Sequence, residues 1–276
     1  MRGACISQIM NLTGRVLVLV AHADDESVGY GALLQKMREA VVVIATDCAP
    51  RDKYFWERFG SRERYALLRR DEARRAMELA KVRELVWLAD EDGRLEDQRL
   101  FLNLTAAYEQ LQELVRRVKP EAIATLAYEG GHPDHDSCSV LGWRLGEKFG
   151  LPVWEAPLYS RGYEEALAGE AISAGRRFGT QGRGRVQRFI CENDEQVVVE
   201  IDAEELEIKR AMCAQYASQG DFLQTFDAGR EVVRPQVNYM YEQSPHEGPT
   251  NYEQWQWWMS ARDVSAKFVE FVEATR

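Results

Sequence analysis

The sequence lacks the features that mark disulfide-rich and membrane-spanning proteins. It has only five cysteines, an odd number without C-x-x-C spacing, which indicates neither a disulfide framework nor a structural zinc knuckle. No stretch approaches the roughly 20 apolar residues that a membrane-spanning helix needs. Residues 1–13 also hold too few apolar side chains for a signal peptide. We therefore expect a cytoplasmic protein with no membrane span.

Basic charge is also scarce. The 35 Lys and Arg residues are outnumbered by 45 Asp and Glu residues, which gives a formal net charge of -10. Binding to nucleic acid or to an anionic membrane needs a basic face, so this balance argues against both kinds of partner. Internal repeats, low-complexity runs and obvious linkers are missing as well.

Short apolar runs alternate with amphipathic segments along the chain. Five consecutive branched residues at 16–20 are typical of a strand buried on both faces of a parallel sheet. Such alternation predicts an α/β, Rossmann-like fold with a mostly parallel sheet sandwiched by helices. The further expected strands are 41–45, 85–88, 122–127, 153–156 and 197–201, and the expected helices are 26–40, 62–81, 104–118, 137–149 and 206–217.

The length and composition favour a single catalytic domain, residues 1–276. We expect residues 14–160 to form the Rossmann-like core that carries the site, and residues 161–276 to form a C-terminal elaboration of loops, a strand and helices that covers it. Trp255, Trp257 and Trp258 lie in this second part. They are expected to pack on the core as a cover, with stacking of one of them on a sugar ring as the alternative.

Histidine and acidic residues follow two of the expected strands. Residues 22–26 come directly after the first strand, and residues 128–136 come directly after strand 122–127. Ligands of open α/β sheets bind at the carboxyl ends of the strands, so both clusters are placed for chemistry. The adjacent carboxylates of Asp24 and Asp25 would repel each other unless a cation or a proton compensated them. With three of the four histidines close by, a metal ion is the simplest compensation.

A catalytic zinc takes about three protein ligands and leaves one position for water. His22, Asp25 and His135 would make such a His-His-Asp set. Asp24 would then be free to act as the general base on the zinc-bound water. His132 is placed to stabilise a developing oxyanion.

Other polar residues near these clusters have supporting or undetermined roles. Asp134 and Asp136 flank His135 and are expected to orient a metal-binding histidine from behind. His246 stands alone in the sequence, and we expect it to lie in a surface loop. Whether His246 or Tyr128 reaches the site stays open at this stage.

The segments AHADDE and GGHPDHD resemble the two signatures of the PIG-L/LmbE-like N-acetylglucosaminyl deacetylases. Members of this family are zinc-dependent hydrolases that remove acetyl groups from N-acetylated sugar conjugates. TDCAP at 46–50, RRDE at 69–72, and the YASQ and NYEQW segments nearer the C-terminus are also similar to the family. The resemblance covers most of the chain.

Carried over by position, the resemblance assigns the same roles as the residues themselves do. The metal ligands fall on His22, Asp25 and His135, which implies one Zn²⁺ per chain, with Fe²⁺ or another divalent metal as alternatives. The general base falls on Asp24, and the oxyanion-side histidine falls on His132.

The resemblance also concerns substrate contacts and shows some departures. It implies that Arg69, in the R-x-x-E helix motif, contacts the substrate, and Asp47 in the TDCAP segment is the second expected substrate contact.

Ala23 stands where the family usually has proline. Some members use a tyrosine two residues before the oxyanion-side histidine, but here that position is Gly130, and Tyr128 lies further back.

We therefore expect a zinc-dependent deacetylase that acts on an N-acetylated sugar or glycoconjugate of the N-acetylglucosamine type. Two alternatives stay open: a mononuclear non-haem iron oxygenase, which uses the same ligand set, and a catalytically inactive sugar-binding homologue. Residues 51–59 and the Arg-rich stretch around Arg176 are expected to select the substrate, with arginine favouring phosphate or carboxylate groups. The oligomeric state is open, a homo-oligomer included.

Overall fold

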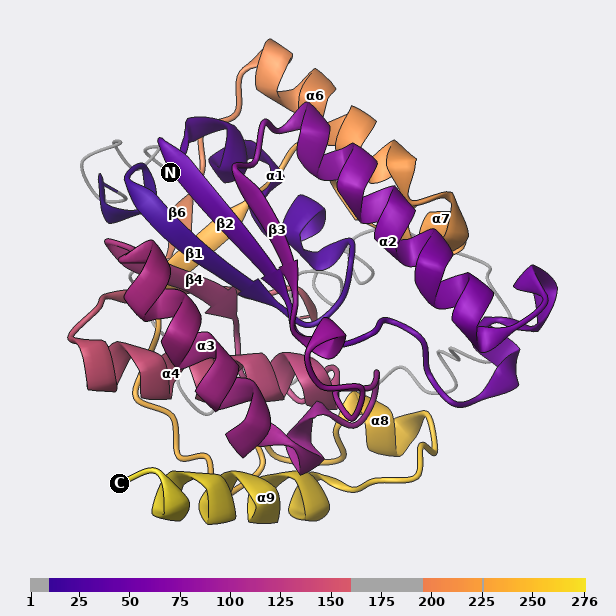
Figure 1. Ribbon diagram of the computed structural model, residues 1–276, viewed down its shortest axis with the longest axis vertical. Coiled ribbons are helices and arrows are strands. Elements are labelled where there is room, and N and C mark those ends of the chain that lie inside the picture. The colour runs from indigo at the N-terminus through magenta and orange to yellow at the C-terminus, as the bar shows by residue number, and fades with distance from the viewer. Residues whose placement is uncertain (1–9, 160–195, 225) are drawn as a thin grey trace.

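The computed structural model describes residues 10–159, 196–224 and 226–276, and within them one seven-stranded sheet lies between two groups of helices (Figure 1). The strand order is β3-β2-β1-β4-β5-β7-β6. The strands are β1 (Arg15–Val20), β2 (Glu39–Ile44), β3 (Glu84–Trp87), β4 (Ala122–Leu126), β5 (Val153–Ala156), β6 (Val197–Val198) and β7 (Val232–Pro235).

The sheet is parallel from β3 to β5 and antiparallel at its other edge. At the centre, Leu17 of β1 lies opposite Val41 of β2 on one side and Ile123 of β4 on the other. β7 then runs antiparallel to both β5 and β6. The predicted α/β fold with a mostly parallel sheet is confirmed. β7 was not predicted, because its four residues VVRP are too short and too polar to show a strand pattern.

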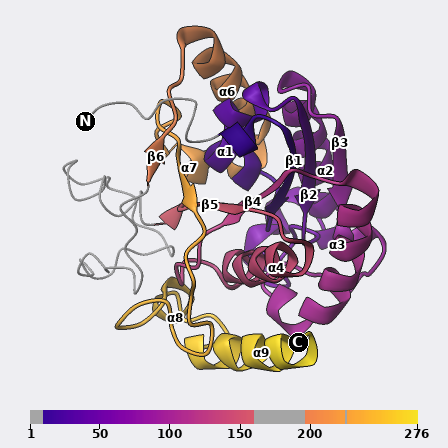
Figure 2. The same cartoon turned by 90° about the vertical axis from the view of Figure 1, so that its left-hand side faces the viewer.

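The helices cover both faces of the sheet. One group comprises α1 (Asp25–Lys36), α2 (Arg62–Leu79) and α6 (Ala203–Gln215), and the other comprises α3 (Leu104–Val118), α4 (Pro133–Phe149) and α9 (Ala261–Ala274). Figure 2 shows α6 at the top of the view, and α4 and α9 below the strands. The short helices are α7 (Gly220–Leu223) and α8 (Asn251–Gln254), and the 3-10 turns are η2 (Met10–Leu12), η3 (Lys53–Phe55), η4 (Glu57–Phe59), η5 (Leu88–Asp90), η6 (Leu100–Leu102) and η7 (Ala217–Gln219).

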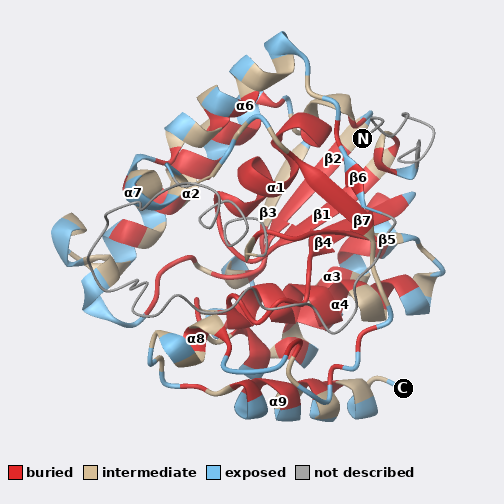
Figure 3. Ribbon diagram, turned by 180° about the vertical axis from the view of Figure 1, so that it is seen from behind, coloured by how far each residue is buried: buried red, intermediate tan, exposed pale blue. Residues whose placement is uncertain are grey.

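The central strands form the core. Every residue of the run 16–20 is inaccessible to solvent, as the five branched side chains predicted. Figure 3 shows the central strands β1, β2 and β4 as buried and the outward faces of α2, α6 and α9 as exposed. In the described ranges, no helix is both long and apolar enough to cross a bilayer. Arg176 lies outside the described residues, so its expected role in substrate selection stays a prediction.

One difference from the expected elements affects the site. Helix α4 begins at Pro133, before the expected start at 137. His132 caps this helix, since its side chain accepts a hydrogen bond from the backbone N–H of Asp134, and proline suits the first turn because it has no N–H to satisfy. His135 therefore lies in the first helical turn, where the backbone holds its direction, and not in a loop.

Candidate active site

The site forms where two neighbouring parallel strands end. β1 and β4 pair directly, so the chain segments that follow them emerge side by side at the carboxyl edge of the sheet. α1 starts at Asp25, directly after the first segment, and α4 starts at Pro133, after the second. The topology thus brings together two clusters that are about a hundred residues apart in the sequence.

The three predicted ligands converge. The ring centroids of His22 and His135 are 5.4 Å apart. Asp25 lies between them, with Oδ1 at 3.2 Å from His135 Nε2 and Oδ2 at 3.5 Å from His22 Nδ1. All three side chains are buried, and their ligating atoms lie within 4.8 Å of one another. Two imidazoles and one carboxylate in this arrangement fit a divalent cation of the zinc type.

Asp25 is ionised in this setting. Burial by itself would raise the pKa of its carboxyl group, but His135 and His22 together hold that pKa well below its usual value. Its Oδ2 also accepts a hydrogen bond of 2.8 Å from the backbone N–H of His22. The carboxylate is therefore held in place between the two histidines.

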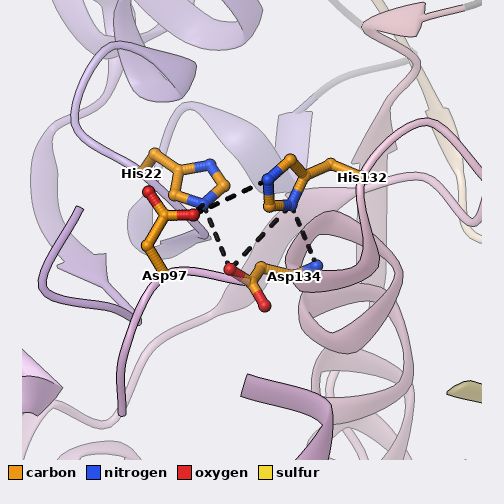
Figure 4. Close-up of side chains that lie close together, drawn as sticks. All are labelled: His22, Asp97, His132 and Asp134. Carbon is orange, nitrogen blue, oxygen red and sulfur yellow. Dashed lines mark hydrogen bonds and ion pairs between the residues drawn. The ribbon is translucent and has the colours of Figure 1, made fainter. Parts of the chain in front are cut away.

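The far side of the His22 ring faces two further carboxylates (Figure 4). His22 Nε2 lies 3.2 Å from Asp134 Oδ2 and 3.3 Å from Asp97 Oδ1. A carboxylate behind a metal-binding histidine sets its tautomer and orients the ring, leaving the other nitrogen for the metal. Burial lowers the pKa of His22, but Asp97, Asp134 and Asp25 outweigh it and raise that pKa well above the usual value. The surroundings thus favour positive charge at this point.

The two acids that flank His135 do different things. Asp134 contacts His22 and also accepts hydrogen bonds from the backbone N–H groups of Gln98 (2.6 Å) and Leu100 (3.0 Å). Asp136 instead accepts hydrogen bonds from the N–H groups at positions 129 and 130, at 3.1 and 3.0 Å. It thus holds the segment 129–131, which contains two glycines and is called the glycine loop below. Burial raises the pKa of Asp136 to about 8. Of these two acids, Asp134 is thus the one that contacts His22.

Asp97 was not identified from the sequence. It lies in the loop between η5 and η6, and its Oδ1 also lies 3.7 Å from His132 Nε2 (Figure 4). Asp47, expected to contact substrate, accepts hydrogen bonds from the N–H groups of Asp97 (3.0 Å) and Ala49 (3.1 Å) and pairs with Arg62. One feature of the sequence could have indicated Asp97: it follows β3, and β3 ends at the same edge of the sheet as β1 and β4.

Asp24 stands beside the ligand set in a strained backbone conformation. Its φ of 124° is rare for a residue with a side chain. Its N–H donates to Glu26 Oε2 at 3.0 Å, while Arg69 Nη2 lies 3.3 Å from Asp24 Oδ2 and bonds to the carbonyl of Ala23. Burial raises the pKa of Asp24 to about 7 and Arg69 opposes this rise. Strain held by surrounding contacts is typical of functional positions.

His132 is held as a neutral hydrogen-bond donor. Its Nδ1 accepts the backbone N–H of Asp134 at 3.1 Å, so Nε2 carries the proton in the neutral ring. Burial, together with His22 and His135, lowers the pKa of His132 well below its usual value. The ring lies 4.4 Å from that of His22, centroid to centroid.

The two residues left open by the sequence are both placed. The hydroxyl of Tyr128 donates to the carbonyl of Gln243 at 2.8 Å, so it faces the C-terminal part of the chain. His246 is buried, and the expectation of a surface histidine is wrong. Its Nε2 fills the space beside Gly130, where an added Cβ would lie 3.0 Å from it. The imidazole thus packs against the glycine loop of the site.

Comparisons with known proteins find one similar sequence family. The sequence model of the PIG-L family, described as GlcNAc-PI de-N-acetylase, matches residues 17–145. A curated relative from Bacillus subtilis (strain 168), named probable N-acetyl-alpha-D-glucosaminyl L-malate deacetylase 2, is 30% identical over 130 residues. That alignment covers 45% of this chain and 56% of the relative, so the similarity spans little more than half of the relative's length.

Solved structures share the fold. A deacetylase–bog complex from the biosynthesis pathway of teicoplanin superposes with a TM-score of 0.61 at 18% identity, covering 82% of this chain and 99% of the other. GalB, the 4-carboxy-2-hydroxymuconate hydratase of Pseudomonas putida KT2440, gives 0.52 at 14% identity, covering 82% and 98%. At such identities the likeness concerns the fold alone, and proteins with this fold are named for more than one reaction.

Proposed function

We propose that this chain, whose resemblance to the PIG-L family is confirmed by the match over residues 17–145, is a zinc-dependent hydrolase that deacetylates an N-acetylated sugar or sugar conjugate. The convergence of His22, Asp25 and His135, with the carboxylate of Asp24 next to them, is the observation that carries the proposal. The name of the curated relative supports the substrate class. A cytoplasmic location belongs to the same proposal.

In this proposal His22, Asp25 and His135 hold the zinc ion. When bound, zinc supplies Lewis-acid polarisation of an amide carbonyl and makes water more acidic. Fe²⁺ or another divalent cation would suit the same donors. Asp134 and Asp97 keep the His22 ring in the orientation that this role requires.

The other residues of the site move protons and stabilise charge. Asp24 takes a proton from the attacking water, and its buried carboxylate is positioned for this by the Arg69 guanidinium 3.3 Å away. His132 donates its Nε2–H to the carbonyl oxygen as this oxygen gains negative charge. Asp24 then passes the proton to the departing nitrogen, so one amide and one water become acetate and a free amine. Arg69 holds Asp24 in position throughout.

The alternatives account for fewer of these contacts. An iron oxygenase needs the ligand set, but it gives no role to a free carboxylate that a buried arginine positions beside the site. A sugar-binding protein without turnover gives no role to the pair formed by Asp24 and His132. The hydrolase explains all of them.

The first test is a pair of variants. We expect Asp24→Asn to keep its zinc while its turnover falls by about 10²–10⁴, the usual contribution of a general base. We expect His135→Ala to lose the metal itself. Acetate and amine release from a panel of N-acetylglucosamine conjugates, together with elemental analysis of the purified proteins, measures both effects.

Glu270→Gln, which changes an exposed carboxylate paired with Lys267 on α9, is the control and should match the wild type. Wild-type turnover in Asp24→Asn would show that the base is wrongly assigned. Oxygen consumption by an iron-loaded protein that releases no acetate would replace the hydrolase with the oxygenase.

A further inference from the structure

Five aromatic rings form a closed circuit at the site. Between neighbouring centroids the distances are 5.1 Å from His135 to Tyr159, 6.3 Å to Trp255, 5.0 Å to Trp257, 5.0 Å to His132 and 5.4 Å back to His135. The two histidines are buried, whereas the other three side chains are partly exposed. We call Tyr159, Trp255 and Trp257 the aromatic rim. Its rings are partly exposed, and those of Tyr159 and Trp257 contact the buried histidines.

Specific contacts build the first part of the rim. The ring of Tyr159 packs on Gly131, where an added Cβ would lie only 2.0 Å from Tyr159 Cδ2. The carboxylate of Glu129 accepts hydrogen bonds from the N–H groups of Leu158 (2.8 Å) and Tyr159 (3.2 Å), which fixes the backbone of the tyrosine. The second glycine of GGHPDHD therefore makes room for an aromatic ring that comes from another segment.

The tryptophans of the rim are anchored to the same loop. Helix α8 docks on the glycine loop through a hydrogen bond of 2.8 Å from Asn251 N–H to the carbonyl of Gly130. The N–H of Trp255 in turn bonds to the carbonyl of Asn251 at 2.8 Å. Trp258, only one residue after the rim, takes another direction and stacks on Phe101 at 5.5 Å. It is 52% exposed and does not belong to the circuit, which makes it a matched control.

A rim of this kind suits one class of ligand surface. The face of an aromatic ring carries negative charge density, so it attracts weakly positive C–H bonds. One face of a pyranose ring presents several C–H groups that neighbouring oxygens polarise, whereas an acyclic N-acetyl amine has no such flat face. Aromatic groups beside convergent polar groups are also the usual lining of small-molecule sites.

We propose that the aromatic rim binds the C–H face of the pyranose ring that carries the acetamido group, and so selects cyclic sugars over acyclic N-acetyl amides. This inference rests on the proposed deacetylase function and deepens it. Tyr159 and Trp255 determine specificity through their rings. Trp257 has a second task, because its ring also packs against His132 at an interplanar angle of 77°.

The test compares kcat/KM for methyl N-acetylglucosaminide and for N-acetylethanolamine, measured by acetate release from the zinc-loaded protein. We expect Trp255→Leu and Tyr159→Leu to lower kcat/KM for the sugar by about three- to tenfold, which corresponds to one aromatic contact. For Trp255→Leu the value for the acyclic amide should stay within about twofold, since that substrate makes no ring contact and the Trp255 ring packs on Tyr159 and Trp257, not on a histidine. Tyr159→Leu also removes a contact with His135, so it should lower both values, and the value for the sugar by the larger factor. Trp258→Leu should change neither value.

Two further variants separate the ring from other effects. Tyr159→Phe keeps the ring and should retain the preference of the wild type. Gly131→Ala displaces the ring and should act like Tyr159→Leu. Zinc content should be unchanged in Trp255→Leu, Tyr159→Leu and Tyr159→Phe, because no residue of the aromatic rim is a proposed zinc ligand. Should Trp255→Leu fail to fold, Trp255→Phe serves in its place, with a smaller change in the same direction.

Equal losses on both substrates in these variants would overturn the inference, because they would indicate a structural role. A wild type that does not prefer the sugar would overturn it as well, even if both substrates are deacetylated. Absence of acetate release from both substrates by zinc-loaded wild type would instead count against the proposed function itself. The two failures are therefore distinguishable.

Discussion

At the scale of single residues, the carboxylate of Asp134 links three segments of the site. It contacts the His22 ring and accepts the N–H groups of Gln98 and Leu100, so one oxygen pair positions both a ligand and the loop that carries Asp97. The carboxylate is wholly buried. In the proposed site it would orient His22 from behind the ring.

We predict that Asp134→Asn lowers zinc affinity by about 10- to 100-fold, the usual effect of losing the group behind a metal-binding histidine. Titration of the metal-free protein with zinc against a competing chelator measures this loss. Asp136→Asn is the control, since Asp136 accepts hydrogen bonds from backbone at positions 129 and 130. It should keep its zinc affinity. Equal losses in the two variants would show that the contact with His22 has no special role.

At the scale of elements, a buried ionic network joins the parallel and antiparallel parts of the sheet. Glu155 of β5 accepts hydrogen bonds from Arg234 Nε of β7 at 2.7 Å and from the hydroxyl of Tyr239 at 2.5 Å. Burial raises the pKa of Glu155 to about 7, although Arg234 and Tyr239 act in the opposite direction. We therefore expect the stability of this network to depend on pH.

The sign of this dependence follows from linkage. In the unfolded chain a glutamate titrates at about 4.3, so between that pH and about 7 the folded state binds the proton more tightly. Glu155 thus contributes stability at low pH that is lost as the pH rises through this window. We predict that Glu155→Gln removes this contribution. Between about pH 5 and about pH 8, the urea midpoint of the variant should therefore fall less than that of the wild type.

The exposed Glu270→Gln variant should leave that difference unchanged. Because other groups also titrate, the comparison is between the pH slopes of the variants and not between absolute midpoints. Identical slopes for Glu155→Gln and the wild type would contradict the prediction. A midpoint that fell more steeply with pH in Glu155→Gln than in the wild type would mean that Arg234 and Tyr239 lower the pKa of Glu155 by more than burial raises it.

At the scale of the whole molecule, the C-terminal part shares its interior with the Rossmann-like core. Lys209 of α6 pairs with Glu231 at 2.7 Å, and both are buried. Glu231 also accepts the N–H groups of Ala32 (2.8 Å) and Leu33 (2.9 Å) in α1. On the other face, the ring of Phe271 in α9 packs against an aromatic ring of α3 at 5.3 Å. We propose that residues 1–276 act as one domain.

A single domain should unfold in one step. We predict that far-ultraviolet circular dichroism, which follows the helices, and tryptophan fluorescence, to which Trp255, Trp257 and Trp258 contribute, give coincident urea transitions. Zinc should move both transitions upwards by the same amount, because it binds only the folded state. Separate transitions, or a shift of one probe alone, would indicate two domains.

The sequence by itself determined the alternation of strands and helices in the core and the edge of the sheet at which the two polar clusters lie. The apolar run 16–20 and the alternation after it were sufficient to predict a parallel sheet, because burial on both faces requires continuous apolar residues. The positions of His22, Asp25 and His135 followed from the rule that parallel strands end at one edge. Their convergence in the structure therefore needed no knowledge of side-chain packing.

Tertiary structure alone decided the contacts between segments that no local pattern links. Asp97 lies in an irregular loop, and two hydrogen bonds hold that loop near His22: the N–H of Asp97 donates to Asp47, and the N–H of Gln98 donates to Asp134. The meeting of Tyr159 with Trp255 depends on how two distant segments pack on one glycine loop. Periodicity reports only which face of an element is buried. Which side chains meet across elements is set by the packing of the whole chain, and that is where the supporting carboxylates and the aromatic rim arise.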